Sequence, residues 1–155
     1  MTQLRQSPRL RTFDYLGLHA YFVTSVTRER RPVLARADIR DRAVRCLREA
    51  AADFSFGLTA YCFMPDHLHV LAGGVTESSD LKEFMRQFKQ RSRFHAKRIT
   101  GAELWQISYH DRVLRNSEAI EDVARYIWFN PVRAGLVSDY RDWPGSGPAP
   151  LPELR

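Results

Sequence analysis

Two runs of strand-forming residues, separated only by Pro65 and Asp66, constrain the fold more than any other feature of the chain. Residues 56–64 (FGLTAYCFM) and 67–75 (HLHVLAGGV) are rich in apolar, aromatic and β-branched side chains, which is typical of strands. Proline is favoured at the first corner of a tight turn, and aspartate is a common turn residue. The sequence therefore predicts a β-hairpin whose second strand begins at His67.

Four further segments predict the elements around this β-hairpin. Aromatic and β-branched residues indicate strands over residues 19–30 and 105–114. Apolar residues at helical spacing indicate a helix over residues 38–52 and a longer one over residues 80–99. Each of these helices would connect two strands, as crossover helices do in α+β domains.

A last helix is expected to begin with Ser117 as its cap. It should end near Asn130, because the proline that follows disfavours helical geometry in the residue before it. The order is then strand, helix, strand, strand, helix, strand, helix. This order predicts an α+β fold of the ferredoxin-like split βαβ type, an antiparallel sheet with helices on one face and the other face open to a substrate.

Composition predicts one domain and a polyanionic partner. The 155 residues are 44% hydrophobic and 27% charged, with a net charge of +6, and a basic domain of this kind favours nucleic acid. We expect a basic N-terminal arm over residues 1–14, a domain over residues 15–143, and a tail rich in proline and glycine over residues 144–155 with no fold of its own.

The chain is expected to act in the cytoplasm and not in a membrane. It has no apolar run near the roughly 18 residues that a bilayer requires. Its basic start lacks the apolar stretch of a secretion signal. Cys46 and Cys62 are far apart in sequence and form no metal-binding pair, so we expect two reduced thiols.

His67 and His69 are candidate metal ligands. Side chains two positions apart on a strand point to the same face, so the two imidazoles project together and can chelate one ion. Two protein ligands are too few for a competent metal site, which needs a third. The spacing alone fits equally a pair of hydrogen-bonded histidines on a sheet.

The last predicted helix supplies partners for the histidine pair. Tyr126 and Asn130 are four residues apart, so they lie on one helical face. Asn130 offers an amide oxygen to a metal ion, and Tyr126 places a phenol beside it. A phenol next to a cation and a polarised phosphate can act as a nucleophile. Taken alone, Tyr126 fits a packing aromatic as well.

Cationic side chains form a row along the predicted helix over residues 80–99. Their steps of three and four residues place them on one face, where they could follow a phosphate backbone or simply be solvated. The row consists of Lys82, Arg86, Lys89, Arg93 and Lys97, and Arg112, Arg115 and Arg133 are further candidates for DNA contact.

Several motifs in a fixed order resemble one protein family. FMPDHLHVL, LWQISYHDRVLR and ARYIWFNPVRAGLV occur in succession, and the chain resembles the REP-associated tyrosine transposases over roughly residues 15–143. These are relatives of the single-tyrosine HUH transposases of small insertion sequences. The family name refers to two histidines around a bulky hydrophobic residue, here His67, Leu68 and His69.

The resemblance implies the HUH nuclease fold and a reaction on DNA. Tyr126 would attack a phosphodiester of single-stranded DNA beside a short palindromic hairpin, giving a 5′-phosphotyrosine link and a free 3′ hydroxyl that can rejoin strands. His67 and His69 would bind Mg²⁺ or Mn²⁺. Relatives often have glutamine as the third ligand, one turn after the tyrosine, where this chain has Asn130. Relatives occur as monomers and as homodimers, and both remain open here.

Two other functions fit parts of the pattern. The first is a regulatory protein of the same lineage that binds hairpin DNA or RNA without cleaving it. The second is a metal-binding protein that acts on a small molecule, which the basic charge and the lack of a glycine-rich phosphate loop disfavour. Asp66, His110 and Asp111 are candidates for auxiliary roles near the histidines.

Overall fold

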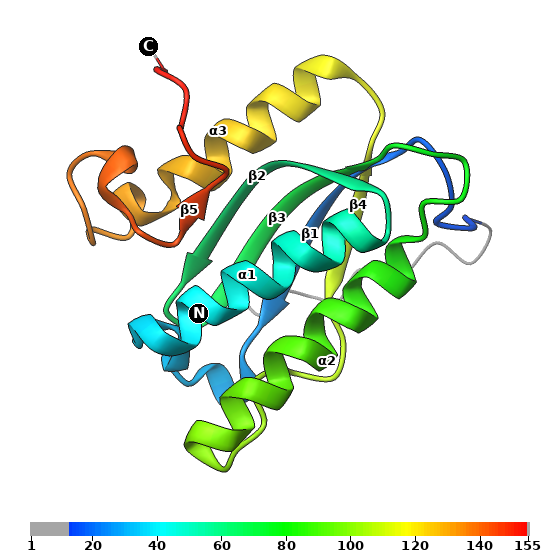
Figure 1. The fold of residues 1–155 in the computed structure, drawn as a ribbon. Helices are drawn as coiled ribbons and strands as arrows, with labels where there is room; N and C mark the ends of the chain where they lie inside the picture. The colour runs from blue at the N-terminus through cyan, green and yellow to red at the C-terminus, as the bar shows by residue number, and fades with distance from the viewer. Residues whose placement is uncertain (1–12, 155) are drawn as a thin grey trace.

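The structure is a computed structural model that describes residues 13–154. Five strands form one antiparallel sheet in the order β4-β1-β3-β2-β5, with three α-helices packed on it (Figure 1). The basic arm expected over residues 1–14 lies outside the described residues, apart from its last two. The elements are β1 (Ala20–Val26), α1 (Ala37–Asp53), β2 (Phe56–Met64), β3 (His67–Gly74), α2 (Leu81–Thr100), β4 (His110–Leu114), α3 (Ser117–Arg133) and β5 (Ser146–Gly147).

The predicted β-hairpin is confirmed. Strands β2 and β3 pair in antiparallel fashion from Met64 opposite His67 onward, and Pro65 and Asp66 form the turn. The fourth strand is shorter than expected, since only His110–Leu114 pairs as a strand with β1. Before it, Trp105 forms an isolated bridge to Thr27.

Helices α1 and α2 begin and end within one residue of their predicted bounds, for identifiable reasons. Helix α1 buries Ile39, Leu47 and Ala50 on one side. Helix α2 is capped by Asp80, whose side chain accepts a hydrogen bond from the Glu83 amide, and it ends at Gly101 in the left-handed region with φ of 72°, a conformation that glycine adopts without strain.

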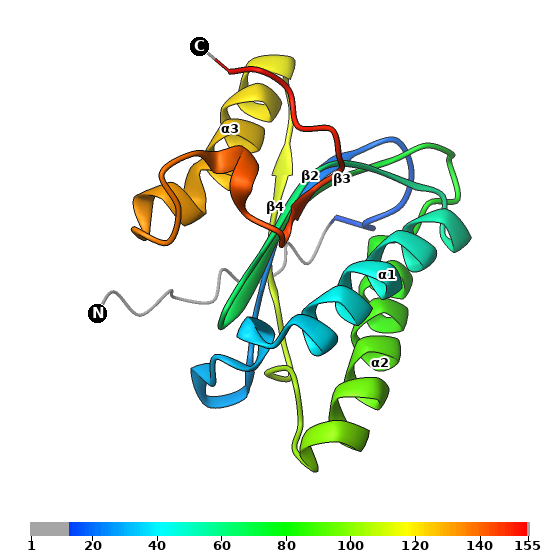
Figure 2. The same cartoon turned by 60° about the vertical axis from the view of Figure 1, so that its left-hand side comes forward.

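The sheet separates two hydrophobic clusters. Alternate residues of β3 point to opposite faces, so Leu68 and Val70 join the cluster beneath α1 and α2, while Leu71 joins the cluster beneath α3. The α+β fold with an antiparallel sheet is thus confirmed. One part of the expectation was wrong: α3 packs on the face opposite α1 and α2, so the helices do not share one face (Figures 1 and 2).

Helix α3 differs from its predicted bounds at both ends. Its cap is Asn116, whose side chain accepts a hydrogen bond from the Ala119 amide at 2.8 Å, and Ser117 is the first helical residue. The helix also continues through Pro131 to Arg133. Pro131 is buried, and packing of this turn against the sheet outweighs the local preference of the residue before a proline.

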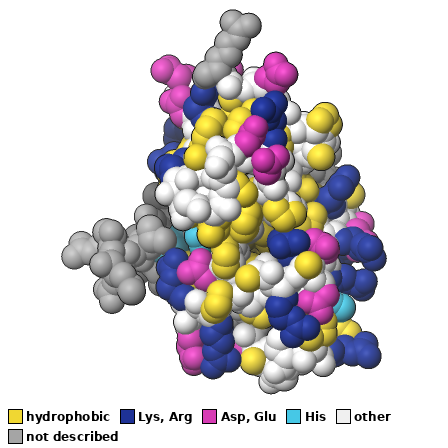
Figure 3. All heavy atoms as spheres, turned by 90° about the vertical axis from the view of Figure 1, so that its left-hand side faces the viewer, with side chains coloured by type: hydrophobic (Ala, Val, Ile, Leu, Met, Phe, Trp, Pro, Cys, Tyr) yellow, Lys and Arg dark blue, Asp and Glu magenta, His cyan; other side chains and the backbone are white. Residues whose placement is uncertain are grey.

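The C-terminal segment packs on the domain, contrary to expectation. Strand β5 pairs with Tyr61 and Cys62 of β2, and Trp143 Nε1 donates a hydrogen bond to the Phe63 carbonyl at 2.9 Å. Tyr140 is further held by a hydrogen bond from its hydroxyl to the Pro152 carbonyl. On the side of the molecule that carries β5, hydrophobic side chains form a band between charged ones (Figure 3). In the described part of the chain, no helix has the length and apolar character needed to cross a membrane.

Candidate functional site

One cavity of about 490 Å³ lies between the sheet and α3 and collects the predicted site residues. Strands β1, β3 and β4 form its floor and α3 one wall. It is lined by Phe22, Thr24, Val26, Arg30, His67, His69, His110, Asp111, Arg112, Tyr126 and Asn130. The sequence analysis had brought His67, His69, Tyr126 and Asn130 together, and the structure places all four in this cavity.

Strand pairing explains why these side chains meet. His67 and His69 point to the α3 face of β3, with ring centroids 4.8 Å apart. Thr24 of β1 lies opposite His69 in one ladder and opposite His110 of β4 in the other. Residues opposite each other in a ladder share a face, so three strands contribute to one surface.

His69 is buried and held by one hydrogen bond. Its side chain is 8% exposed, and its Nδ1 lies 2.8 Å from Thr24 Oγ1. Burial, together with electrostatic interactions with His67 and Arg133, lowers the pKa of His69 to about 3. The imidazole is therefore neutral at pH 7. With Nδ1 donating to Thr24, it keeps an Nε2 lone pair available to a ligand.

His67 is oriented by Asp66. Its Nδ1 lies 2.7 Å from Asp66 Oδ1, and because a carboxylate only accepts, this nitrogen is the donor. Partial burial raises the pKa of Asp66, but hydrogen bonds and electrostatic interactions with His67 and Arg30 outweigh it and lower that pKa overall. The second ring nitrogen, Nε2, is 3.3 Å from Asn130 Nδ2.

Tyr126 reaches the cavity from α3 and is 48% exposed. Its ring centroid lies 5.9 Å from that of His69 and 6.1 Å from that of Phe22, both in edge-on arrangements. The Arg133 guanidinium lies over the same ring, 4.1 Å from its centroid, and donates a hydrogen bond to the Tyr126 carbonyl at 2.6 Å. The phenol is thus held beside the histidines with its hydroxyl accessible.

The donor set fits a divalent metal ion. Among the described residues, no three His, Cys, Asp or Glu side chains converge on one point, so a third protein ligand must be of another type. Asn130 could serve as that ligand, because a turn of its amide would present oxygen where Nδ2 now faces His67. Both imidazoles have their other nitrogen fixed by Asp66 or Thr24, the arrangement that orients histidine ligands in metal sites.

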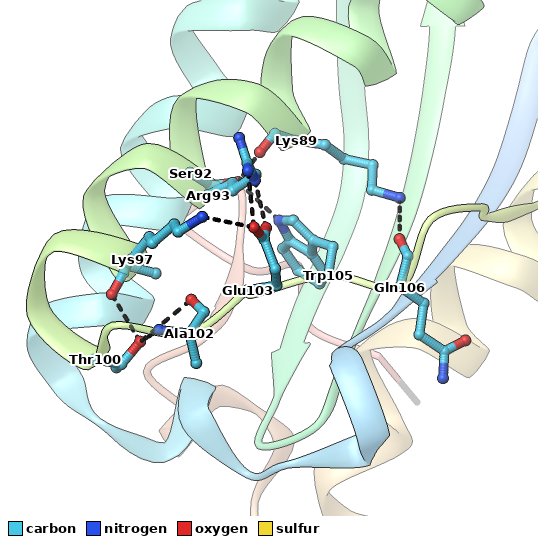
Figure 4. Close-up of polar contacts among 10 residues, drawn as sticks. Lys89, Ser92, Arg93, Lys97, Thr100, Ala102, Glu103, Trp105 and Gln106 are labelled. Atoms are coloured by element: carbon cyan, nitrogen blue, oxygen red, sulfur yellow. Dashed lines mark hydrogen bonds and ion pairs between the residues drawn. The ribbon is translucent and has the colours of Figure 1, made fainter.

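The cationic row on α2 lies across the sheet from this cavity and is largely engaged within the chain. Arg86 pairs with Glu83 at 2.9 Å, and Lys82 lies over the Tyr15 ring. Arg93 and Lys97 both bind Glu103, and Lys89 Nζ donates to the Gln106 carbonyl (Figure 4). The spacing that suggested a DNA-binding face could not reveal Glu103, which lies beyond the helix.

The other predicted cations lie nearer the cavity. Arg112 lines it and lies 5.8 Å over the Phe22 ring, and Arg133 contacts Tyr126. Arg115 is exposed after β4 and does not line the cavity.

Sequence reasoning missed four lining residues. They come from β1 and the turn after it, where no catalytic or metal-binding motif marks them, and they are Phe22, Thr24, Val26 and Arg30. The only available signal was strand pairing: residues of β1 that face the histidines had to contribute to the same surface.

Residues 16–129 match the family model described as "Transposase IS200 like". The chain is 29% identical to the "Putative REP-associated tyrosine transposase" of Haemophilus influenzae, over 88% of this chain and 82% of that protein. It is 27% identical to the "REP-associated tyrosine transposase" of Escherichia coli, over 85% and 78% of the two chains.

A solved structure has a similar fold. It is described as "Structure of the REP associates tyrosine transposase bound to a REP hairpin", with a TM-score of 0.73 and 21% sequence identity. The match covers 90% of this chain and 82% of that one. The α+β arrangement of sheet and helices therefore recurs in a protein of the same description as the sequence relatives.

Proposed function

The chain belongs to the IS200-like transposase family, and on that premise we propose that it nicks and rejoins single-stranded DNA beside a DNA hairpin, through a covalent bond from Tyr126 to a 5′ phosphate. The observation that carries the proposal is the meeting of Tyr126 from α3 with His67 and His69 from β3 in one cavity. Each of the three groups has a defined place in phosphoryl transfer, and a protein that only bound DNA would not need this arrangement.

The proposed step exchanges one bond at phosphorus for another. The Tyr126 phenol oxygen attacks the phosphorus and forms a new O–P bond, the P–O3′ bond breaks, and the 3′ oxygen leaves as a hydroxyl. The phenol proton passes to solvent and the 3′ oxygen gains a proton from it. Attack of the 3′ hydroxyl on the phosphotyrosine reverses these changes and rejoins a strand.

The residues around Tyr126 position the reactants. Arg133 and the edges of Phe22 and His69 hold the phenol ring, and such restraint favours attack in a defined direction. Arg112, at the cavity wall, offsets phosphate charge.

His67, His69 and Asn130 are the residues that would hold a divalent ion, Mg²⁺ or Mn²⁺. When bound, such an ion supplies Lewis acidity that polarises the non-bridging phosphate oxygens. Two nitrogen donors make the set more favourable to Mn²⁺ than an all-oxygen site is.

A hairpin-bearing DNA is the proposed partner. The net charge of +6 suits a polyanion, and the solved structure with a similar fold is described as bound to a REP hairpin. A DNA hairpin presents its unpaired flank as a single strand, which is the form that the proposed reaction uses.

The test is a covalent adduct assay. Labelled single-stranded DNA carrying a hairpin is incubated with the protein and Mn²⁺ and run on a denaturing gel. We expect a labelled protein band that disappears in Tyr126→Phe, while DNA binding stays nearly intact. Tyr109→Phe is the matched control, because it removes a phenol that does not line the cavity. Tight binding without an adduct on several hairpins would favour the non-cleaving regulatory protein instead.

The metal assignment has a separate test. We expect His67→Ala to lose metal-dependent adduct formation, because the cavity then lacks one of two imidazole donors. The wild-type adduct should also vanish in excess chelator and return when Mn²⁺ is restored. Activity that persists in chelator would remove the metal from the mechanism.

A further inference from the structure

The turn that follows β1 has an unusual backbone. Glu29 has φ of 56° and Arg30 has φ of 51°, so two successive residues other than glycine lie in the left-handed region. Such residues are disfavoured, and they persist only where the surrounding structure holds them. The turn therefore presents its side chains at an energetic cost.

The tip of the β2–β3 hairpin holds this turn in place. Thr27 donates from its amide to the Asp66 carbonyl at 3.0 Å, and its hydroxyl is shared between that carbonyl at 3.0 Å and the Arg31 carbonyl at 2.8 Å. A few residues later, the Leu34 amide donates to the Pro65 carbonyl at 3.0 Å. The turn is thus fixed to the two residues that precede His67.

The result is that Arg30 faces the cavity. Its Nε donates to Asp66 Oδ2 at 3.2 Å, and Asp66 Oδ1 in turn holds His67. The guanidinium has five N–H donors, and among the described residues its Nη atoms have no hydrogen-bond or ion-pair partner. The side chain is 50% exposed and lines the cavity.

The neighbouring arginines of the turn do not share this position. Arg31 pairs with Glu29 at 2.8 Å, and Arg28 lines a groove beside α2. Neither lines the cavity that holds the histidines. Of the three arginines in the strained turn, only Arg30 therefore lies at the cavity.

We propose that Arg30 is a phosphate-binding residue that contacts a backbone phosphate of the DNA strand in the cavity, with its place relative to His67 fixed by Asp66. A half-exposed ion pair contributes little to stability, so a purely structural role does not account for a strained backbone here. Free guanidinium donors beside a phosphate-cleaving site suit a two-pronged contact with phosphate oxygens. The inference rests on the proposed function for its substrate.

The first test measures DNA binding in the Tyr126→Phe background, where no cleavage occurs. Arg30→Asn removes the guanidinium, and asparagine tolerates the left-handed backbone. Arg31→Gln is the matched control, because it removes the same charge one residue away and outside the cavity. We expect Arg30→Asn to bind a hairpin-bearing single strand about tenfold more weakly, with a salt dependence reduced by roughly one phosphate contact. Arg31→Gln should stay within about twofold of its parent.

The second test locates the phosphate. Oligonucleotides carrying a single neutral methylphosphonate are scanned through the linkages around the hairpin base. The loss caused by Arg30→Asn should disappear at one linkage and persist at all others. A loss that persists at every linkage, or one that Arg31→Gln reproduces, would overturn the inference.

These tests are independent of cleavage. If the protein with Tyr126 intact forms no adduct but the linkage-specific loss is seen, Arg30 binds phosphate in a protein that does not nick. If the adduct forms and no linkage is specific, the nicking function stands and Arg30 is not its phosphate contact. Thermal melting of Arg30→Asn near that of its parent confirms that the comparison concerns folded protein.

Discussion

At the scale of residues, each histidine of the pair has one ring nitrogen held by a neighbour. Asp66 holds His67 Nδ1 and Thr24 holds His69 Nδ1. For His67 this leaves Nε2 as the nitrogen with a lone pair, since a carboxylate only accepts; for His69 the same holds when the Thr24 hydroxyl accepts from Nδ1. The HxH spacing puts the two rings on one face, but only these partners decide which nitrogen each ring presents.

Removing the Asp66 carboxylate should therefore weaken metal binding at the proposed site, of which Asp66 is not itself a ligand. We expect Asp66→Asn to bind Mn²⁺ about 10- to 100-fold more weakly, because the amide no longer fixes the His67 tautomer and ring orientation. Titration calorimetry measures this, with Asp41→Asn on α1 as a control of equal charge change. Equal Mn²⁺ affinity in Asp66→Asn and its parent would contradict the role of Asp66.

Burial of His69 predicts a pH dependence of stability. The free imidazole has a pKa near 6.5, whereas that of folded His69 is about 3, so the unfolded chain binds more protons between these values. Stability from this residue is complete above about pH 6.5 and is lost as the pH falls toward 3, with a slope approaching about 1.4 kcal/mol per pH unit.

Urea unfolding from pH 7 to 4, in chelator, checks this slope. We expect the free energy of unfolding of His69→Gln to depend less steeply on pH than that of the wild type, since the buried imidazole is gone. Identical slopes in wild type and His69→Gln would show that the buried imidazole is not the group responsible.

At the scale of elements, α3 and α2 both carry residues predicted to act in catalysis or DNA binding, but only those of α3 lie beside the cavity. Helix α3 continues through Pro131, so Tyr126, Asn130 and Arg133 lie on one rigid helix beside the cavity. Helix α2 lies across the sheet, and four cations of its row are engaged by Glu83, Glu103 and backbone carbonyls. An amphipathic pattern indicates which side of a helix is buried, but it does not indicate which face of the sheet the helix covers.

This difference predicts which cations matter for DNA. We expect Arg112→Gln, at the cavity wall, to weaken binding of hairpin-bearing single-stranded DNA several-fold, because a charge near the bound phosphates is lost. Arg86→Gln on α2 should have a smaller effect, since that guanidinium is already paired with Glu83. Equilibrium binding at several salt concentrations compares the two. A larger loss in Arg86→Gln would restore α2 as the DNA-binding face.

At the scale of the whole molecule, the C-terminal segment links the sheet edge to α3. Trp128 of α3 donates from Nε1 to the Gly147 carbonyl at 3.0 Å, and Gly147 belongs to the strand that pairs with β2. The position of α3, which carries Tyr126, thus depends on residues that follow the domain predicted over residues 15–143. The opposite layer has a comparable contact, in which Trp105 Nε1 donates to Ser92 Oγ at 2.9 Å.

The two tryptophans allow stability and function to be separated. We expect Trp128→Phe and Trp105→Phe each to lower the free energy of unfolding by about 1–2 kcal/mol, because each leaves a buried hydrogen-bonding group without its partner. Only Trp128→Phe should also lower adduct formation by Tyr126, since it loosens α3. Equal adduct yields from the two variants would mean that the position of α3 does not depend on the C-terminal segment.

Local sequence patterns were enough to predict the β-hairpin, two of the helices and the family. Pro65 and Asp66 between two strand-forming runs predicted the β-hairpin, and helical spacing predicted α1 and α2, because turn preference and side-chain periodicity act within a few residues. The same periodicities placed His67 with His69, and Tyr126 with Asn130. The motifs around them identified the family that the comparison of residues 16–129 confirmed.

How these elements pack together depends on long-range contacts. The side of the sheet that α3 covers, the packing of the C-terminal segment, and the binding of Arg93 and Lys97 by Glu103 depend on contacts between parts of the chain that no local pattern links. Thr24 and Arg30 belong to the site only because β1 pairs with β3 and because the turn after β1 is fixed to Asp66. Such contacts form when distant strands pair and bury a common face, and their free energy is a property of the assembled fold.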